Sequence, residues 1–471
     1  MVITRSGTRT KSEELNDEEF QDNISNGKHQ INGNARMATD EKSVASGMHR
    51  VTFISLLLDL LGFTVILPLF PALLDYYSKN DSSGLYAYLL GWVTYYQDLL
   101  GVPHQFNSVL FGGLLGSLFS FLQFLSSPIT GALSDVYGRK PIVIATLIGI
   151  AASYGMWAVA SNFLMFVMAR VIGGISKGNV SLSYSIMADI FDQKSRSKGM
   201  ALIGIAFSIG FIIGPVIGAM FSRQGSSGWF ASSALFALTL ALLNIAYFTI
   251  FFKETLPKSK RRVSLSGGLL QAWEFTNPIS LFSFRPLKSL EKKERSQLMT
   301  LGFCYFTYLF LYSGLEFTLT FVTHHKHNYS SMDQGKMFLY LGIIMSLMQG
   351  GYVRRTKDGQ EKPMSIKGII MMIPGFLLVG LSSTWIGLYS GLTLYAMGSS
   401  MMVPCLTALA SLHGTDSEKG TLLGIWRSLG ALARVVGPVV ASIGFWCVGS
   451  EWCYALGGIM MVVPLFILTN Y

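Results

Sequence analysis

The sequence predicts an all-α membrane protein with twelve transmembrane helices, arranged as two six-helix bundles around a central cavity. Three observations support this fold class. Of the 471 residues, 51% are hydrophobic and only 13% are charged, whereas a soluble protein carries about 25% charged residues. The chain contains twelve long apolar runs, and a basic segment separates the first six from the last six.

A helix that crosses the hydrocarbon core of a bilayer needs about 20 predominantly apolar residues. Runs of this kind occupy residues 51–71, 108–130, 140–160, 163–188, 200–221, 229–252, 298–322, 334–353, 364–384, 386–410, 421–444 and 453–469. The aromatic-rich stretch 84–102 would add a thirteenth span. Counting it would place Lys and Arg clusters on both sides of the membrane, against the positive-inside rule. We therefore expect 84–102 to be a loop at the membrane surface.

Charge divides the chain into four parts. Residues 1–49 are polar and lack an apolar period, which is typical of a disordered tail. The N-terminal bundle covers 50–252, a cytosolic linker with ten Lys and Arg residues covers 253–297, and the C-terminal bundle covers 298–471. Because the basic segments share one side, both termini are expected in the cytosol. The net charge of +10 then indicates topology and contact with lipid headgroups, not nucleic-acid binding.

The loops on the opposite side contain few special features. Asn80 and Asn328 begin acceptor triplets there and are candidates for N-linked glycans. Cys447 and Cys453 flank a loop and could form a bridge, although free thiols are the preferred interpretation. The stretch HHKH at 324–327 is expected to be solvated. The sequence shows no P-loop, nucleophile–base pair or metal-spaced cluster, so it predicts no enzyme activity, no metal and no cofactor.

The fifth and eleventh predicted helices repeat one pattern of small residues. Gly204, Gly210 and the pair Gly214–Pro215 are followed, in the same order in the second half, by Gly424, Gly430 and the pair Gly437–Pro438. An ordered match in the same helix of each half indicates internal duplication, as in many transporters. The residues expected to allow close packing and helix kinks are Gly210, Gly214, Pro215, Gly218, Gly437 and Pro438.

Four motifs together resemble the major facilitator superfamily. They are GALSDVYGRKP (131–141), RVIGG (170–174), GFIIGPVIG (210–218) and KETLP (253–257). The resemblance is strongest to animal tetracycline transporter-like members and runs from the first to the last span. It implies a transporter of organic anions or drugs, in the plasma membrane or the inner nuclear membrane. We expect the protein to be monomeric. The resemblance also implies a gating loop made of Gly131, Asp135, Gly138, Arg139 and Lys140, with both glycines in a tight turn and Asp135 facing the start of helix 421–444. The alternative is that this loop only anchors the topology.

Six ionisable side chains lie within the predicted spans: Asp59, Arg170, Lys177, Glu316, Arg427 and Arg434. Each costs about 2.5–3.5 kcal/mol at mid-helix, so each needs a partner or a water-filled cavity. Two acids cannot neutralise four bases. Arg170 and Lys177 are seven residues apart, and so are Arg427 and Arg434. The two members of each pair therefore lie on one face of their helix. This excess of positive charge predicts a cavity for an anion.

The individual roles stay open at this point. Lys177 and Arg434 are the main candidates for binding the anion, with Gln123 and Asn179 as polar contacts or packing residues. Arg170 could serve gating or proton coupling, and Arg427 could reach the membrane surface. Asp59 and Glu316 are either structural partners of the cations or groups that exchange protons.

The leading functional hypothesis is a secondary transporter that moves small organic anions by alternating access, with protons as a candidate coupling ion. One alternative is a drug–proton antiporter for cationic or zwitterionic compounds such as tetracycline, which the motif GPVIG (214–218) favours. The other is a receptor or scaffold that transports nothing. Charges inside the spans disfavour it, because a scaffold does not need them.

Overall fold

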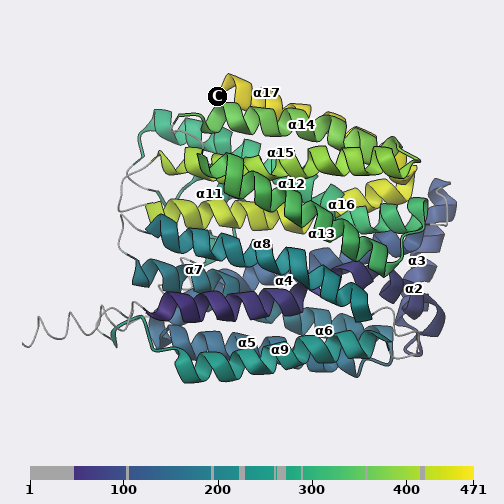
Figure 1. Cartoon of the computed structure of the whole chain (residues 1–471), viewed down its shortest axis with the longest axis horizontal. Coiled ribbons are helices and arrows are strands. Elements are labelled where there is room, and N and C mark those ends of the chain that lie inside the picture. Colours follow the sequence, from purple (N-terminus) through teal and green to yellow (C-terminus); the bar gives the residue numbers. More distant parts are fainter. Residues whose placement is uncertain are drawn as a thin grey trace, which may run out of the picture.

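The computed structural model describes residues 47–101, 106–191, 196–221, 229–258, 261, 272–287, 290–355, 359–413 and 419–471. The regular elements in these ranges are all helical. Most helices run side by side along the long axis of the molecule, with the first half of the chain below the second half in Figure 1. The predicted disordered tail lies outside the described ranges except for residues 47–49, which are helical and begin the first span instead.

The first half of the chain begins with the helical segment Gly47–Asn80, which passes through the 3-10 turn η1 (Leu67–Leu69) into α2 (Phe70–Asn80). The following helices are α3 (Leu85–Leu100), α4 (Asn107–Tyr137), α5 (Arg139–Ala158), α6 (Phe163–Ser176), α7 (Asn179–Ile190), α8 (Arg196–Phe221) and α9 (Trp229–Phe251). Helices α6 and α7 together form one continuous span, Phe163–Ile190.

The second half begins with the short helix α11 (Pro278–Ser283). It continues with α12 (Lys292–His327) and α13 (Ser331–Leu347), which is extended by the π turn η5 (Met348–Tyr352) and by η6 (Val353–Arg355). The last helices are α14 (Glu361–Leu381), α15 (Trp385–Ser411), α16 (Lys419–Met460) and α17 (Val462–Asn470).

The described residues cross the membrane twelve times, as the sequence predicts. Ten segments are at least 18 residues long and apolar enough to span, and α13, with 17 residues, is just shorter. The segment Thr421–Asn470 accounts for two crossings, because the chain turns at Gly449 (φ 80°, ψ 172°). Gly437 and Gly457 both approach α12 at the level of Gly314 and Leu315. The chain therefore returns along α12 after the turn, and glycine supplies the positive φ.

The stretch 84–102 differs from the prediction of a loop. Residues 85–100 form α3, a helix of 16 residues bounded by Gly84 (φ 75°) and Gly101 (φ 67°). Tyr86 on one face packs against Phe163, with ring centroids 5.1 Å apart, while Trp92 on another face is 52% exposed. Burial of one face stabilises the helix. At 16 residues it is too short to add a thirteenth span.

The predicted linker 253–297 is partly helical. It contains α11 and ends inside α12, which begins at Lys292. Phe284 is fully buried, and its ring packs closely against Gly302 of α12. A Cβ added at Gly302 would lie only 2.9 Å from this ring. Residues 259–260, 262–271 and 288–289 of this stretch lie outside the described ranges. The second part of the linker thus packs against the second half of the chain.

The two halves repeat one helix contact. The Thr64 hydroxyl donates to the Gly210 carbonyl of α8 at 2.9 Å, and the Ser313 hydroxyl of α12 donates to the Ala433 carbonyl of α16 at 3.4 Å. In both pairs a Cβ on the next motif glycine, Gly214 or Gly437, would collide with the same hydroxyl-bearing side chain. The equivalent packing in each half agrees with internal duplication.

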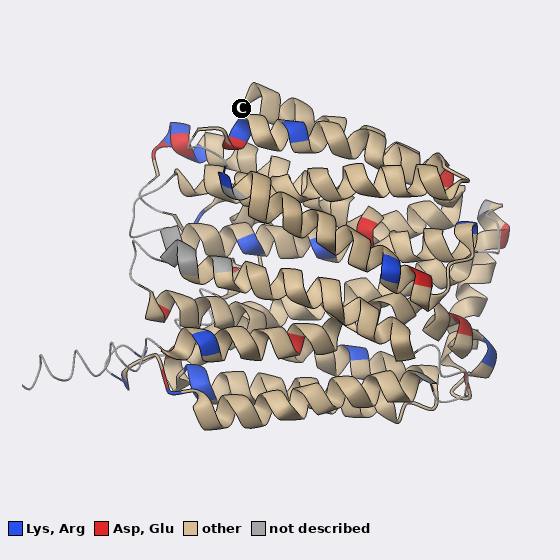
Figure 2. Ribbon diagram, in the orientation of Figure 1, with Lys and Arg blue, Asp and Glu red and all other residues tan. Residues whose placement is uncertain are grey.

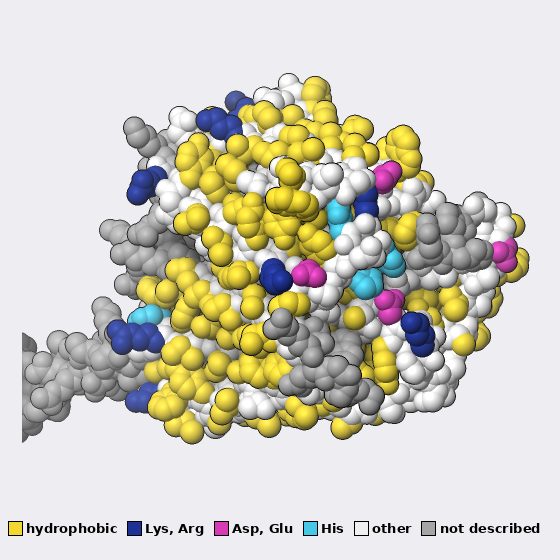
Figure 3. Space-filling model, turned by 45° about the vertical axis from the view of Figure 1, so that its right-hand side comes forward, with side chains coloured by type: hydrophobic (Ala, Val, Ile, Leu, Met, Phe, Trp, Pro, Cys, Tyr) yellow, Lys and Arg dark blue, Asp and Glu magenta, His cyan; other side chains and the backbone are white. Residues whose placement is uncertain are grey.

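Charged residues lie at both ends of the helices, with several more along their length (Figure 2), and hydrophobic side chains cover a broad region between the ends (Figure 3). We call one end the basic end; there the Lys253 amide meets Met48 and Arg261 meets the Tyr137 carbonyl. We call the other the histidine end, with His324, His325 and His327 at the end of α12. Asn80 and Asn328 are both exposed at the histidine end.

Candidate functional site

The predicted gating loop is held together by Arg139 at the basic end. Its guanidinium donates to Asp135 at 2.7 Å and to Asp189 of α7 at 2.9 Å. Glu254 accepts from the backbone amides of Arg139 and Lys140, at 2.9 and 3.1 Å, and so caps the start of α5. These bonds join four segments of the first half around one arginine.

The two glycines of the predicted gating loop differ in the structure: one lies in the turn and the other does not. Gly138 has a φ of 104°, which favours glycine in the turn. Gly131 instead lies inside α4, and a Cβ there would meet nothing within 4 Å, so the expectation that it serves the turn is wrong. The predicted contact of Asp135 with the start of α16 depends on residues 414–418, which lie outside the described ranges.

Asp59 and Lys177 form a buried ion pair in the first half. The Lys177 ammonium lies 2.7 Å from Asp59 Oδ2, and the residues are 3% and 4% exposed. The same ammonium lies 4.7 Å from the centroid of the Phe63 ring. Lys177, which the sequence placed in an anion site, therefore has its charge already compensated. The ammonium tethers the end of α6 to the first segment.

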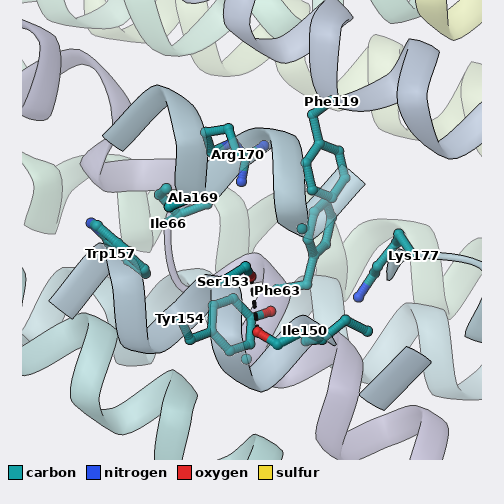
Figure 4. A pocket seen from close by; sticks show the side chains of 12 residues that line it. Phe63, Ile66, Phe119, Ile150, Ser153, Tyr154, Trp157, Ala169, Arg170 and Lys177 are labelled. Atoms are coloured by element: carbon teal, nitrogen blue, oxygen red, sulfur yellow. Dashed lines mark hydrogen bonds between the residues drawn. The ribbon is translucent and has the colours of Figure 1, made fainter. Parts of the chain in front are cut away.

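Arg170 lies in the same region without an acidic partner. Its guanidinium carbon is 4.2 Å from the centroid of the Phe119 ring. Within the described part of the chain it makes no hydrogen bond or ion pair, and its Nε is buried. Arg170, Lys177 and Tyr154 line a cavity between the first segment and helices α4, α5 and α6. Figure 4 shows the Phe63 and Phe119 rings between the two basic side chains.

Glu316 is the acidic group of the second half. Its Oε1 accepts hydrogen bonds from the hydroxyls of Tyr312, at 2.7 Å, and Tyr395 of α15, at 3.2 Å. These two tyrosine rings stack with centroids 5.5 Å apart and an interplanar angle of 5°. Among the described residues no cation lies within 4.0 Å of Glu316, although Arg434 is near enough to interact with it electrostatically.

Arg434 and Arg427 differ in their surroundings although both lie on α16. Arg434 is exposed and makes no hydrogen bond or ion pair with any described residue. Arg427 crosses to the first half: its guanidinium carbon lies 3.1 Å from the centroid of the Tyr184 ring in α7, and its Nη2 lies 3.6 Å from Met200 Sδ in α8. The structure thus gives Arg427 an aromatic partner in the first half of the chain.

The two predicted polar contacts stay apart from these groups. Gln123 is half-buried on α4, and Asn179 is 4% exposed with an Oδ1 that has no partner in the described ranges. Neither side chain bonds to a charged residue there. Sequence reasoning missed Tyr184, Tyr312 and Tyr395. The available signal was that a tyrosine inside a span has a hydroxyl that needs a partner.

The membrane-spanning segments carry an excess of positive charge. Arg170, Arg427 and Arg434 have no acid within 4.0 Å in the described ranges, whereas of Asp59 and Glu316 only Glu316 lacks a cation at that distance. All four cysteines, including Cys447 and Cys453, are free thiols. No group of three or more potential metal-binding side chains occurs in the residues that were described. The arrangement is suited to binding an anion.

Comparisons with known proteins agree with this fold. The family model described as the Major Facilitator Superfamily matches residues 52–438. The chain is 42% identical over 424 residues to human Major facilitator superfamily domain-containing protein 10, covering 89% of this chain and 91% of that protein. It is 25% identical over 400 residues to the class B tetracycline resistance protein of Escherichia coli, covering 84% and 87%.

Solved structures give the same result. The crystal structure of the human organic anion transporter MFSD10 (TETRAN) superposes with a TM-score of 0.76 and 41% identity, covering 90% of this chain and 99% of that one. The peptide transporter POT superposes with a TM-score of 0.65, 91% and 97% coverage and 13% identity. The second match shows the fold alone.

Proposed function

The chain belongs to the major facilitator superfamily of membrane transporters, and on this premise we propose that it moves small organic anions across a membrane by alternating access. A transporter role excludes the receptor or scaffold alternative, and the protein is not an enzyme. The similarity to a protein named as a human organic anion transporter supports the cargo class.

The observation that carries the proposal is the state of Arg434. A charged side chain at this depth costs about 2.5–3.5 kcal/mol unless it is paired or hydrated. Arg434 is exposed and has no ion pair with a described residue. An anion in a water-filled cavity would supply the missing partner, and a guanidinium binds a carboxylate through two parallel hydrogen bonds. Arg170 and Arg427 add positive potential. Lys177 has a structural role, because it is paired with Asp59.

Uptake of a labelled aromatic carboxylate by purified protein in liposomes tests the proposal. Hydrogen bonds to a charged group contribute about 1.5–3 kcal/mol, so Arg434→Ala should weaken apparent affinity roughly 10- to 150-fold. Arg434→Lys should keep part of the affinity, because it retains charge without the planar fork. The control is Lys336→Ala, which removes a surface cation that is 66% exposed. Parent-like uptake by Arg434→Ala would rule out the assignment.

We further propose proton coupling through Glu316, with Asp59 as a second candidate. Glu316 has no cation within 4.0 Å in the described ranges and two tyrosine donors, so it can exchange a proton without breaking an ion pair. Asp59 would first have to release Lys177. Uptake by Glu316→Gln should lose its response to a pH gradient while exchange at equal pH continues, and Glu451→Gln at the surface should behave like the parent. A parent indifferent to pH gradients would exclude coupling.

A second candidate function is a drug–proton antiporter for cationic or zwitterionic compounds. The identity with a tetracycline resistance protein supports it, and so does Glu316, because a carboxylate beside stacked tyrosine rings suits a cation. Transport of a lipophilic cation that depends on Glu316 and is unaffected by Arg434→Ala would favour this function over anion transport.

We also propose that the basic end faces the cytosol with both termini, and that the protein works as a monomer of two bundles, 50–252 and 298–471, joined by 253–297. Glycosidase digestion tests the orientation: modification should depend on Asn80 or Asn328 at the histidine end, and modification at Asn23 would reverse it. The molar mass from light scattering of the protein in detergent tests whether it is a monomer.

We also propose that the protein is located in the plasma membrane or the inner nuclear membrane, which fluorescence imaging of the tagged protein in cells tests.

A further inference from the structure

A contact between the two halves closes the histidine end. His324 on α12 lies with its Nε2 3.1 Å from Asp75 Oδ2 on α2. Beside it, His325 Nε2 lies 3.3 Å from the Ser108 hydroxyl of α4. Figure 3 shows histidine side chains next to acidic ones on the surface of this end. Because the partners belong to different halves, any opening of this end must separate His324 from Asp75.

The surroundings confirm that this end is closed. The rings of Phe106, before α4, and Phe445 of α16 meet edge to face at 5.1 Å. Asn107 accepts a hydrogen bond of 3.1 Å from the Trp446 indole. A Cβ at Gly113 of α4 would collide with Ser442 of α16. Tight packing of this kind must be undone when the end opens, so a modest polar contact can shift the balance between states.

The hydrogen bonds of His324 impose a requirement on its protonation. Its Nδ1 lies 3.2 Å from the Tyr329 carbonyl oxygen and its Nε2 faces the Asp75 carboxylate. Both partners are acceptors only. A neutral imidazole has one N–H and can satisfy one of them, leaving two acceptors facing each other at the second contact. The imidazolium has two N–H groups and satisfies both. The closed geometry therefore favours the protonated ring.

Water can reach this imidazole. His324 is 31% exposed in its side chain and Asp75 is 43% exposed. A groove lined by Pro68, Pro71, His324, Ser331 and Gln334 runs along the seam between the halves. An unperturbed histidine titrates near pH 6.5. The ring can thus exchange protons with the solution on the histidine side at pH values near neutrality.

The other charged groups around His324 are accounted for. On its own helix, the His325 ring lies 5.4 Å away, and Lys326 pairs with Glu451 of α16 at 2.9 Å. His327 follows on the same helix. On α13, Asp333 pairs with Lys336 at 3.3 Å, and on α3 the hydroxyl of Tyr86 interacts electrostatically with Asp75. Asp75 is the one of these groups that contacts the imidazole of His324.

The contact at the opposite end has different chemistry. Arg427 and Tyr184 join the halves there through a cation–π contact. A guanidinium stays protonated throughout the physiological range. Acidification near neutrality therefore acts on the His324 contact and not on the Arg427 contact.

We propose that His324 and Asp75 form a proton-sensitive gate, in which protonation of His324 stabilises the conformation closed at the histidine end. Acid on that side then holds this end shut, and neutral pH releases it. The gate acts on the conformation of the carrier whatever its cargo is.

Spin-label distance measurements on protein in lipid nanodiscs test this gate. Labels at Ser161→Cys and Ser383→Cys report separation of the halves, since both residues are exposed at the histidine end. Cys447→Ser removes the one native cysteine that is not buried. The Asp75 carboxylate favours the imidazolium in the closed state, by the modest amount typical of a half-exposed ion pair. The closed-to-open ratio should then rise about two- to threefold from pH 7.5 to pH 5.5.

Matched variants decide the mechanism. His324→Gln should abolish the pH response, and His327→Gln should keep it. In Asp75→Asn the new amide can donate to the neutral ring, so closure should be favoured at pH 7.5 and should not increase at pH 5.5. The proposal is overturned if the parent ratio does not change with pH, if His324→Gln still responds, or if Asp75→Asn responds like the parent.

Discussion

The buried ion pair between Asp59 and Lys177 gives the sharpest test of how charge is handled inside the spans. The ammonium and carboxylate lie 2.7 Å apart, with side chains only 4% and 1% exposed. Removing one partner leaves the other charge buried and unpaired. Replacing both by apolar side chains of similar volume removes the burial cost of both charges. We therefore expect Asp59→Leu and Lys177→Met to be harmful singly and tolerated together.

The expected size follows from known ion pairs. Breaking a buried pair costs about 3–5 kcal/mol, whereas replacing both members is often neutral or stabilising. With an unfolding entropy of about 2.1 cal/mol/K per residue over roughly 420 residues, each kcal/mol lowers Tm by about 1 °C. Each single variant should thus lower the apparent Tm by about 3–5 °C. The double variant should return to within about 1 °C of the parent.

Thermal unfolding of detergent-purified variants at one scan rate measures these shifts, and the four proteins form a double-mutant cycle. Lys336→Met is the control, because it breaks an exposed pair with Asp333 that contributes at most about 1 kcal/mol. Additive losses in the double variant would refute the argument. Anion uptake by the double variant adds a functional result: parent-like uptake excludes Lys177 from substrate contact, as its pairing implies.

Three further predictions concern packing, a turn and the basic end. Gly214→Val should destabilise the protein by about 1–3 kcal/mol, because a Cβ at this position collides with Thr64 of the first segment. Gly204→Val is the control: a Cβ there meets nothing within 4 Å, so its loss of stability in the same melting assay should be smaller. Despite partial burial, hydrogen bonds from backbone amides lower the pKa of Asp81 to about 2, so its contribution to stability persists above about pH 4 and is lost toward pH 2. Asp81→Ala should accordingly lower the Tm at pH 7 by about 1–2 °C, and an unchanged Tm would contradict this. Tyr184→Leu removes the aromatic partner of Arg427 and should increase labelling of cysteines introduced at the basic end; unchanged labelling would show that the contact does not hold that end closed.

Hydropathy and charge predicted the spans because each helix must satisfy its own backbone in lipid. The same local signals were insufficient for α3. The positive-inside rule excluded a thirteenth span there and so predicted a loop at the membrane surface, but the segment is a helix that packs Tyr86 against Phe163. At Gly131 the error is in the other direction, because the sequence predicted a turn where the structure has a helix. The glycine belongs to a loop motif, but α4 continues through it to Tyr137.

The sequence by itself determined which charges enter the membrane, because insertion cost depends on composition and length. It did not determine which of them remain available. Lys177 and Arg434 are both basic residues at bilayer depth, but one is 2.7 Å from Asp59 and the other is exposed without an ion pair to a described residue. Pairing depends on which helices lie side by side, and residues 59 and 177 meet only after four helices pack. Tertiary structure alone therefore separates a structural ion pair from an available cation, and equally brings His324 to Asp75.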